Sequence, residues 1–208
     1  MGGVTERRRV IGLTGGIGVG KSTAGAVLEE LGAVVIDCDQ LGRDVAASDG
    51  AAYPGIVERF GPGVVSKDGE LDRAALATVV FNDPQALNDL NAITHPAIDE
   101  EIEHRIAEAD PSAPVVLDMA VLVDSNLGAG IYNEVLVIEA PLEARLARLH
   151  DQRGMAPDDA RARIESQVSD EQRREVADHI IVNDGDRDSL RTALTEWWER
   201  TGRTFRAR

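Results

Sequence analysis

The sequence RVIGLTGGIGVGKS, residues 9–22, joins a short apolar run to a glycine-rich segment that ends in Lys21-Ser22. Residues 15–22 match the pattern G-x-x-x-x-G-K-[ST], a loop whose backbone N–H groups point at phosphate oxygens. The apolar run predicts a strand before the loop, and the periodicity of residues 21–31 predicts a helix after it. The motif therefore has the context that a phosphate-binding loop requires.

Each fixed position of this loop has a chemical role. Lys21 is predicted to neutralise the β- and γ-phosphates of ATP, and the Ser22 hydroxyl to bind Mg²⁺. The N-terminus of the following helix adds partial positive charge at the same place. The residues predicted to contact ATP are Gly16, Ile17, Gly18, Val19, Gly20, Lys21, Ser22 and Thr23.

Apolar runs and helical segments alternate along the rest of the chain. Gly32 ends the first helix, and residues 33–37 predict a second strand, which together give a βαβ unit of a parallel sheet. Further strands are predicted at residues 114–118, 134–139 and 179–182. The predicted fold class is α/β: a P-loop NTPase fold with a parallel central sheet, a helical acceptor-binding insertion and a helical lid.

The 208 residues suit a single domain. Its predicted parts are a core at 8–37, 112–140 and 178–200, an insertion at about 39–110, and a lid at about 145–175. Asp72 and Asp83-Pro84 predict helix starts in the insertion, and a further helix is expected after His95-Pro96. Residues 157–174 are predicted to be helical, and residues 201–208 to form a frayed tail.

Composition limits the partners and the compartment. The net charge of −15 repels nucleic acid and anionic membranes, so neither is an expected partner. One cysteine, Cys38, permits no intramolecular disulfide, and no apolar stretch reaches the length that spans a bilayer. We expect a cytoplasmic protein that is a monomer or a weak homo-oligomer.

Other sequence motifs and the chain length narrow the class of phosphate-loop protein. GTPases carry an N-K-x-D element, which this sequence lacks. The D-x-x-G pattern at Asp39–Gly42 follows the loop too closely to be a GTPase switch, and the chain is too short for a large motor ATPase. Kinases of nucleotides and small metabolites remain.

Two carboxylates stand where a kinase acceptor is expected. Asp37 and Asp39 follow the second strand, and ligands bind at the carboxyl ends of parallel strands. Either could accept the proton of an acceptor hydroxyl, and both would point the same way if the strand continued to Asp39. Asp39 could instead cap the next helix. Arg43 could hold an anionic substrate group or be a solvated surface arginine.

Other polar residues complete the predicted site. Asp118 ends an apolar strand and is predicted to bind Mg²⁺, with a strand-end cap as the alternative. His95 could contact the acceptor, start a helix or pack against it. Arginines in the predicted lid could stabilise phosphoryl charge or form a solvated face paired with nearby acids. They are Arg145, Arg148, Arg153, Arg161, Arg163, Arg173 and Arg174.

From Val10 to about Trp198 the chain resembles the bacterial dephospho-coenzyme A kinase family. The segments that carry the resemblance are residues 11–22, residues 35–39 with Arg43, Leu71-Asp72-Arg73, Leu90-Asn91, His95-Pro96, Arg148, Arg163 with Gln167, and residues 177–183. The resemblance implies a three-part kinase that transfers the γ-phosphate of ATP to the ribose 3′-hydroxyl of dephospho-coenzyme A, the last step of coenzyme A synthesis.

The resemblance also implies residue roles. Asp39 matches the general base and Arg148 the lid arginine, Arg43 and His95 fall in the acceptor region, and Asn183 falls near the adenine. The family usually has Pro-Leu-Leu, an aromatic or aliphatic residue and Glu after the third strand, whereas this chain has Ala120-Val121-Leu122-Val123-Asp124. Leu122 is the predicted acceptor contact in this segment, so acceptor affinity is the property that we expect the departure to change.

Two other functions fit the same loop. One is phosphorylation of another small metabolite or of a nucleoside monophosphate, which a panel of acceptors would reveal. The other is a non-catalytic switch that binds ATP and engages a protein partner, which would need no base on the acceptor side.

Overall fold

The structure is a computed structural model, and it describes residues 7–125, 127–202 and 204–205. The chain forms two compact units. The sheet unit contains the described residues up to Asp37 together with the chain from Ile106 onward, and the helical unit is Cys38–Arg105.

A five-stranded parallel sheet forms the centre of the sheet unit, in the order β3-β4-β2-β5-β6. Every residue of β2 and β5 is buried, as expected for strands covered on both faces. The predicted α/β fold with a parallel central sheet is confirmed. The strands are β2 (Val10–Thr14), β3 (Val34–Asp37), β4 (Val115–Asp118), β5 (Glu134–Glu139) and β6 (His179–Val182).

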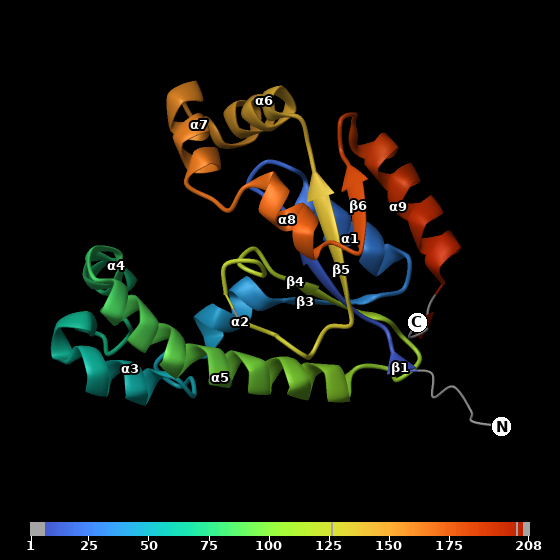
Figure 1. Cartoon of the computed structure of the whole chain (residues 1–208). Helices are drawn as coiled ribbons and strands as arrows, with labels where there is room; N and C mark the ends of the chain where they lie inside the picture. The colour runs from blue at the N-terminus through green and yellow to red at the C-terminus, as the bar shows by residue number, and fades with distance from the viewer. Residues whose placement is uncertain (1–6, 126, 203, 206–208) are drawn as a thin grey trace. The chain divides into compact units, whose positions relative to one another are not determined.

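Helices cover the sheet on both faces (Figure 1). Helices α1 (Lys21–Glu30) and α9 (Arg187–Thr201) pack against each other, with α1 behind the strands and α9 to the right of β6 in this view, and α8 (Asp170–Val176) packs in front of β5. The strand β5 points toward α6 (Leu142–Arg153) and α7 (Pro157–Glu165). The core between the sheet, α1 and α9 is aliphatic with two tryptophans; it includes Ile11, Leu13, Leu28, Leu136, Ile138, Leu194, Trp197 and Trp198.

The predicted frayed tail is partly wrong. Helix α9 continues to Thr201, and β7 (Thr204–Phe205) pairs antiparallel with β1 (Arg7–Arg8). The pairing satisfies backbone groups that an unpaired β1 would leave open. Residues 203 and 206–208 of the predicted tail lie outside the described residues.

The helical unit is built as its capping residues predict. The Asp72 carboxylate accepts hydrogen bonds from the N–H groups of Ala74 and Ala75, at 3.1 and 2.9 Å, which confirms Asp72 as an N-cap. Pro84 begins the next helix, also as predicted. The helices are α2 (Cys38–Asp44), α3 (Tyr53–Phe60), the 3₁₀ helix η1 (Pro62–Val64), α4 (Arg73–Asn82) and α5 (Pro84–Glu108).

No helix begins at His95-Pro96, and that prediction is wrong. Both residues lie inside α5, which runs without interruption from Pro84 to Glu108. A proline in a helix interior removes one hydrogen bond and costs about 3 kcal/mol. Ile98 and Ile102 are buried on the following turns, so packing continues past the proline. At the end of α5, the Arg8 guanidinium donates to the carbonyl oxygens of Ile106, Ala109 and Asp110.

The segment 157–174, predicted as helical throughout, contains a break. Helix α7 ends at Glu165 and α8 begins at Asp170. The Ser169 hydroxyl accepts from the Gln172 N–H, and the Gln172 side chain accepts from the Ser169 N–H. This capping box starts a new helix, because it satisfies N–H groups that a continuous helix would bond internally.

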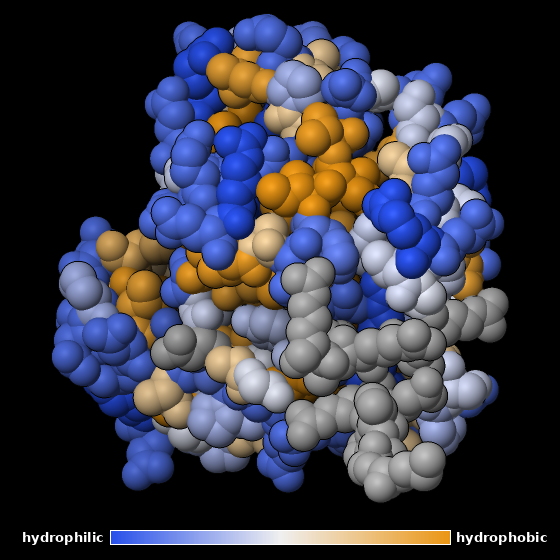
Figure 2. All heavy atoms as spheres, turned by 45° about the vertical axis from the view of Figure 1, so that its right-hand side comes forward, coloured by the Kyte–Doolittle hydropathy of each residue, from blue (hydrophilic) through white to orange (hydrophobic). Residues whose placement is uncertain are grey.

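In the view of Figure 2, hydrophilic side chains cover most of the surface, and hydrophobic ones gather in small patches between them. Among the residues that the structure describes, none of the helices combines the length and the apolar character needed to cross a membrane.

Candidate active site

At some of its glycines the phosphate loop has no room for a side chain. A Cβ at Gly15 would lie 2.5 Å from the carbonyl oxygen of Ile138 on β5. Gly18 and Gly20 have φ values of 80° and 97°, in the left-handed region that favours glycine. Gly20 directly precedes α1, so the loop delivers the chain to the helix N-terminus in the arrangement that binds phosphate.

Lys21 begins α1 and forms an ion pair with Asp118 at the end of β4. Both side chains are largely buried, with exposed fractions of 16% and 14%. Strand β4 pairs directly with β2, where Leu13 lies opposite Asp118. Adjacent parallel strands therefore bring the loop lysine and the strand-end carboxylate together.

Oxygen donors near Lys21 have the chemistry that Mg²⁺ prefers. Ser22 is exposed in the first turn of α1, and Asp118 supplies a carboxylate. In the described part of the chain, His, Cys, Asp and Glu side chains form no group of three or more that could hold a metal. Mg²⁺ needs no such group when it binds one or two protein oxygens together with substrate phosphates and water.

The second half of the loop, Gly18–Gly20, is held by Asn183 and Arg148. The Asn183 amide donates to the carbonyl oxygen of Val19 at 2.8 Å. One Arg148 nitrogen, Nη2, donates to the backbone and side-chain oxygens of Asn183 and to the Gly185 carbonyl, at 3.0–3.1 Å. The other, Nη1, lies 3.4 Å from the carbonyl oxygens of Gly18 and Val19. Arg148 thus braces the loop through carbonyl oxygens.

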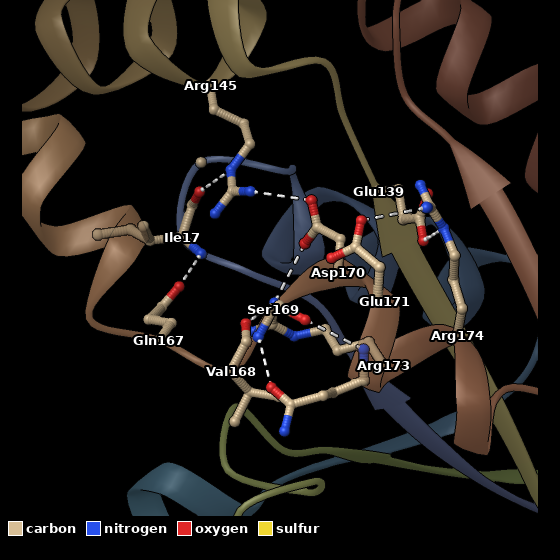
Figure 3. A network of polar contacts seen from close by, with 12 residues as sticks. Ile17, Glu139, Arg145, Gln167, Val168, Ser169, Asp170, Glu171, Arg173 and Arg174 are labelled. Carbon is tan, nitrogen blue, oxygen red and sulfur yellow. Dashed lines mark hydrogen bonds and ion pairs between the residues drawn. The ribbon is translucent and has the colours of Figure 1, made fainter.

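The first half of the loop, Gly16–Ile17, is held by a different set of side chains (Figure 3). The Ile17 N–H donates to the Gln167 side chain at 2.8 Å. The Ile17 carbonyl accepts from Nε of Arg145, on α6, at 2.9 Å. Both backbone polar groups of Ile17 are therefore fixed by residues of the predicted lid.

Two buried arginines meet one carboxylate beside Ile17. Nη1 of Arg145 lies 3.3 Å from one oxygen of Asp170, and Nη1 of Arg173 lies 3.1 Å from the other. Each arginine side chain is 4% exposed, whereas Asp170 is 29% exposed. Burial lowers the pKa of Arg145; the Asp170 charge opposes that shift and the Arg173 charge adds to it.

The remaining lid arginines have surface positions. Arg174 is half-exposed and binds both oxygens of Glu139 at 2.7 Å, and this hydrogen-bonded pair raises the pKa of Arg174. Arg153, Arg161 and Arg163 are exposed.

The predicted acceptor residues fall on several elements. Strand β3 ends at Asp37 and α2 begins at Cys38, so the strand does not continue to Asp39 and the two carboxylates do not share a strand face. Asp39 lies half-buried in the first turn of α2, inside the helix and not at its N-cap. Arg43 is exposed in the last turn of α2, four residues on, where its Nε donates to the Gln40 side chain at 2.8 Å.

The other two predicted acceptor residues, His95 and Leu122, lie on α5 and in the turn after β4. His95 is half-buried in the middle of α5. Leu122 is 4% exposed and packs over β2, where a Cβ at Gly12 would lie 2.5 Å from it. The acceptor roles of Asp39, Arg43, His95 and Leu122 stay predictions.

Comparisons with known proteins decide the family. Residues 9–189 match the family model described as dephospho-CoA kinase. The chain belongs to the dephospho-CoA kinase family. The resemblance drawn from the sequence is confirmed.

Individual relatives agree with this membership. A dephospho-CoA kinase from Frankia casuarinae is 44% identical over 189 residues, which cover 91% of this chain and 82% of the relative. A crystal structure from Thermus thermophilus matches 95% of this chain and all of its own, with a TM-score of 0.80 and 30% identity. The structure of a dephospho-CoA kinase from Campylobacter jejuni matches 92% of this chain and 96% of its own, with a TM-score of 0.60 and 25% identity.

Within this dephospho-CoA kinase family member, the sequence interpretation did not place Arg145, Asp170 and Arg173 at the loop. A usable signal existed for Arg145, which precedes the buried Leu149 by four residues and so lies on the inward face of α6. The S-x-x-Q pattern at Ser169–Gln172 marks the start of α8 and hence the place of Asp170.

Proposed function

We propose that this chain transfers the γ-phosphate of ATP to the ribose 3′-hydroxyl of dephospho-coenzyme A, giving coenzyme A and ADP in the final step of coenzyme A biosynthesis. The family match over residues 9–189 carries the proposal, because it spans the phosphate loop, the helical unit and the helices after β5. The Lys21–Asp118 pair at the loop supports it with the chemistry of a phosphoryl-transfer site.

In this reaction a bond forms between the 3′-oxygen and the γ-phosphorus, and the bond from that phosphorus to the β,γ-bridging oxygen breaks. The loop N–H groups and Lys21 bind the phosphates, and Asp39 accepts the proton of the 3′-hydroxyl. Ser22 and Asp118 would hold Mg²⁺, which supplies positive charge against the phosphates when bound. Asn183 lies by the adenine, and Arg43, His95 and Leu122 contact the acceptor.

The test is ADP release from ATP and Mg²⁺, with and without dephospho-coenzyme A, together with the mass of the acceptor product. We expect release to depend on the acceptor and the product to carry one added phosphate. ATP binding without stimulation by this acceptor would contradict the proposal. Transfer to another hydroxyl in a panel would then indicate a different small-metabolite or nucleoside-monophosphate kinase, and binding without any transfer would indicate a switch.

The general-base role of Asp39 has a separate test. Replacing the carboxylate in Asp39→Asn removes the proton acceptor and should lower kcat by about 10²–10⁴-fold. The dissociation constant for ATP should change little, because the loop is untouched. Asp37→Asn is the matched control, since Asp37 is the neighbouring carboxylate at the end of β3. A near-normal kcat for Asp39→Asn, or an equal loss for Asp37→Asn, would remove Asp39 from this role.

The proposed setting is the cytoplasm. The support is the absence of any possible intramolecular disulfide, given one cysteine, and a net charge of −15 that disfavours nucleic acid and anionic membranes as partners. A monomer or a weak homo-oligomer is proposed.

A further inference from the structure

Arg145 and Arg173 carry donor groups that the described part of the chain does not satisfy. Nη2 of Arg145 and Nε of Arg173 are buried, and neither finds a hydrogen-bond partner among the described residues. Buried polar groups are nearly always hydrogen-bonded, so an unpartnered donor on a buried cation calls for an explanation. The two guanidiniums share a single carboxylate, Asp170, which leaves the cluster with one positive charge in excess.

Both guanidiniums face the phosphate loop. A Cβ at Gly16 would lie 2.5 Å from Nη2 of Arg145 and 3.4 Å from Nη1 of Arg173. Gly16 is one of the loop residues predicted to contact ATP phosphate. The unpartnered Nη2 therefore lies directly over the part of the chain where an anion is expected.

Asp170 holds these arginines in the way that a phosphate would. Each of its two oxygens accepts from a different guanidinium, at 3.3 and 3.1 Å (Figure 3). Phosphate oxygens bind arginine pairs with the same geometry and with more negative charge. Asp170 is also 29% exposed at the first residue of α8, so its carboxylate has access to water.

We propose that Asp170 is a resident counterion for Arg145 and Arg173, and that the terminal phosphate of ATP displaces it from them. The inference rests on the proposed function and deepens its ATP site. In the exchange, oxygens of the γ-phosphate accept hydrogen bonds from the two guanidiniums, and the Asp170 carboxylate turns to solvent. ADP lacks that phosphate, so Asp170 keeps the arginines when ADP is bound. Asp170 therefore weakens ATP binding more than it weakens ADP binding.

The test is the affinity of the full chain for ATP and for ADP, each with Mg²⁺ and without acceptor, by isothermal titration calorimetry. Asp170→Asn keeps the shape of the side chain and removes its charge. We expect ATP to bind about tenfold more tightly, because a charged hydrogen-bonding competitor is lost, and ADP affinity to change less than about twofold. Unchanged or weaker ATP binding by Asp170→Asn would overturn the proposal and leave Asp170 as a support for the arginines.

Glu171→Gln is the matched control. It removes the same charge one residue away, from a side chain that is 77% exposed and lies 3.8 Å from Arg174. We expect less than about a twofold change in ATP affinity, since an exposed pair contributes little. A gain equal to that of Asp170→Asn would mean that overall charge is responsible, and would overturn the proposal.

A double-mutant comparison tests whether Asp170 acts through the arginines. In an Arg173→Gln background, Asp170→Asn should tighten ATP binding clearly less than tenfold, because only the contact between Asp170 and Arg145 is left to compete. A persistent tenfold gain would contradict the inference. Failure of the wild-type chain to bind ATP would instead overturn the proposed function and this inference together, whereas equal ATP binding by wild type and Asp170→Asn overturns the inference alone.

Discussion

The two halves of the phosphate loop are held by arginines three residues apart on α6, and the two arginines do different things. Arg148 has both terminal nitrogens within 3.4 Å of carbonyl or amide oxygens along Gly18–Gly20 and residues 183–185. Arg145 binds the Ile17 carbonyl and Asp170, but its buried Nη2 over Gly16 has no partner among the residues that the structure describes.

The two arginines thus differ in their contacts, and the role predicted for Arg148 at the transferred phosphate stays a prediction. An arginine whose two terminal nitrogens donate to neutral oxygens braces the local fold, and its loss leaves those oxygens without that donor. An arginine that is buried beside a second cation, with donors to spare, has the electrostatics of an anion site. Residue type and helix position alone do not separate Arg145 from Arg148.

The largest expected effect is on catalysis and comes from Lys21, the residue that follows the loop. Lys21→Ala removes the cation that both halves direct toward the phosphates, and we expect kcat/KM to fall by about 10³-fold. The melting temperature should also fall, because Lys21→Ala takes the cation away from the largely buried Asp118 carboxylate. Steady-state kinetics and a thermal melt give both values. Substantial remaining turnover would show that the arginines, and not Lys21, dominate phosphate binding.

The second prediction compares how substitutions of Arg148 and Arg145 change the stability of the protein. Arg148→Ala takes a donor away from the part-buried carbonyl oxygens of Gly18 and Asn183, and we expect a loss of about 2–4 kcal/mol. For a chain of this size the melting temperature should fall by about 5–10 °C. Arg145→Gln should lower the melting temperature less and weaken ATP binding by about tenfold. Equal stability losses in the two variants, or a loss of ATP affinity only for Arg148→Ala, would contradict the assignment of different roles to the two arginines.

The smallest effect tests the space above Gly16. A Cβ in Gly16→Ala would meet Nη2 of Arg145 at 2.5 Å, so the arginine must shift. We expect ATP affinity to fall by about threefold to tenfold with little loss of stability, because the atom displaced is the end of a flexible side chain. Calorimetric titration with ATP measures the change.

Gly25→Ala is the matched control for this variant. Its Cβ would meet only ordinary contacts, at 3.7–3.9 Å, within helix α1. We expect stabilisation of up to about 1 kcal/mol from helix propensity and unchanged ATP affinity. Similar losses of affinity in both variants would show that any added methyl near the loop is harmful.

Elements with strong local signals were predictable from the sequence. The parallel strands follow from apolar runs, the phosphate loop from its fixed glycines and lysine, and α4 from the Asp72 cap. The ion pair between Lys21 and Asp118 was not predicted, because the order of the strands in the sheet, which places β4 beside β2, is not visible in the sequence.

Features that depend on packing were not predictable. Pro96 favours a helix boundary locally, but burial of Ile98 and Ile102 carries α5 through it. The β1–β7 pairing joins residues nearly 200 positions apart, which no local pattern reports. The roles of Arg145 and Arg148 depend on which oxygens surround each guanidinium, and that information exists only after the chain has folded.

The pairing of β3 with β4 has a consequence for how the chain can vary. Asp37 lies opposite Asp118, so about 80 residues leave the sheet and return to the neighbouring strand. The entropy of closing a flexible loop grows only with the logarithm of its length. A loop of that length costs about 2.5 kcal/mol more to close than a five-residue turn. The segment between β3 and β4 can therefore be lengthened or replaced over evolutionary time while the sheet that positions the phosphate loop stays the same.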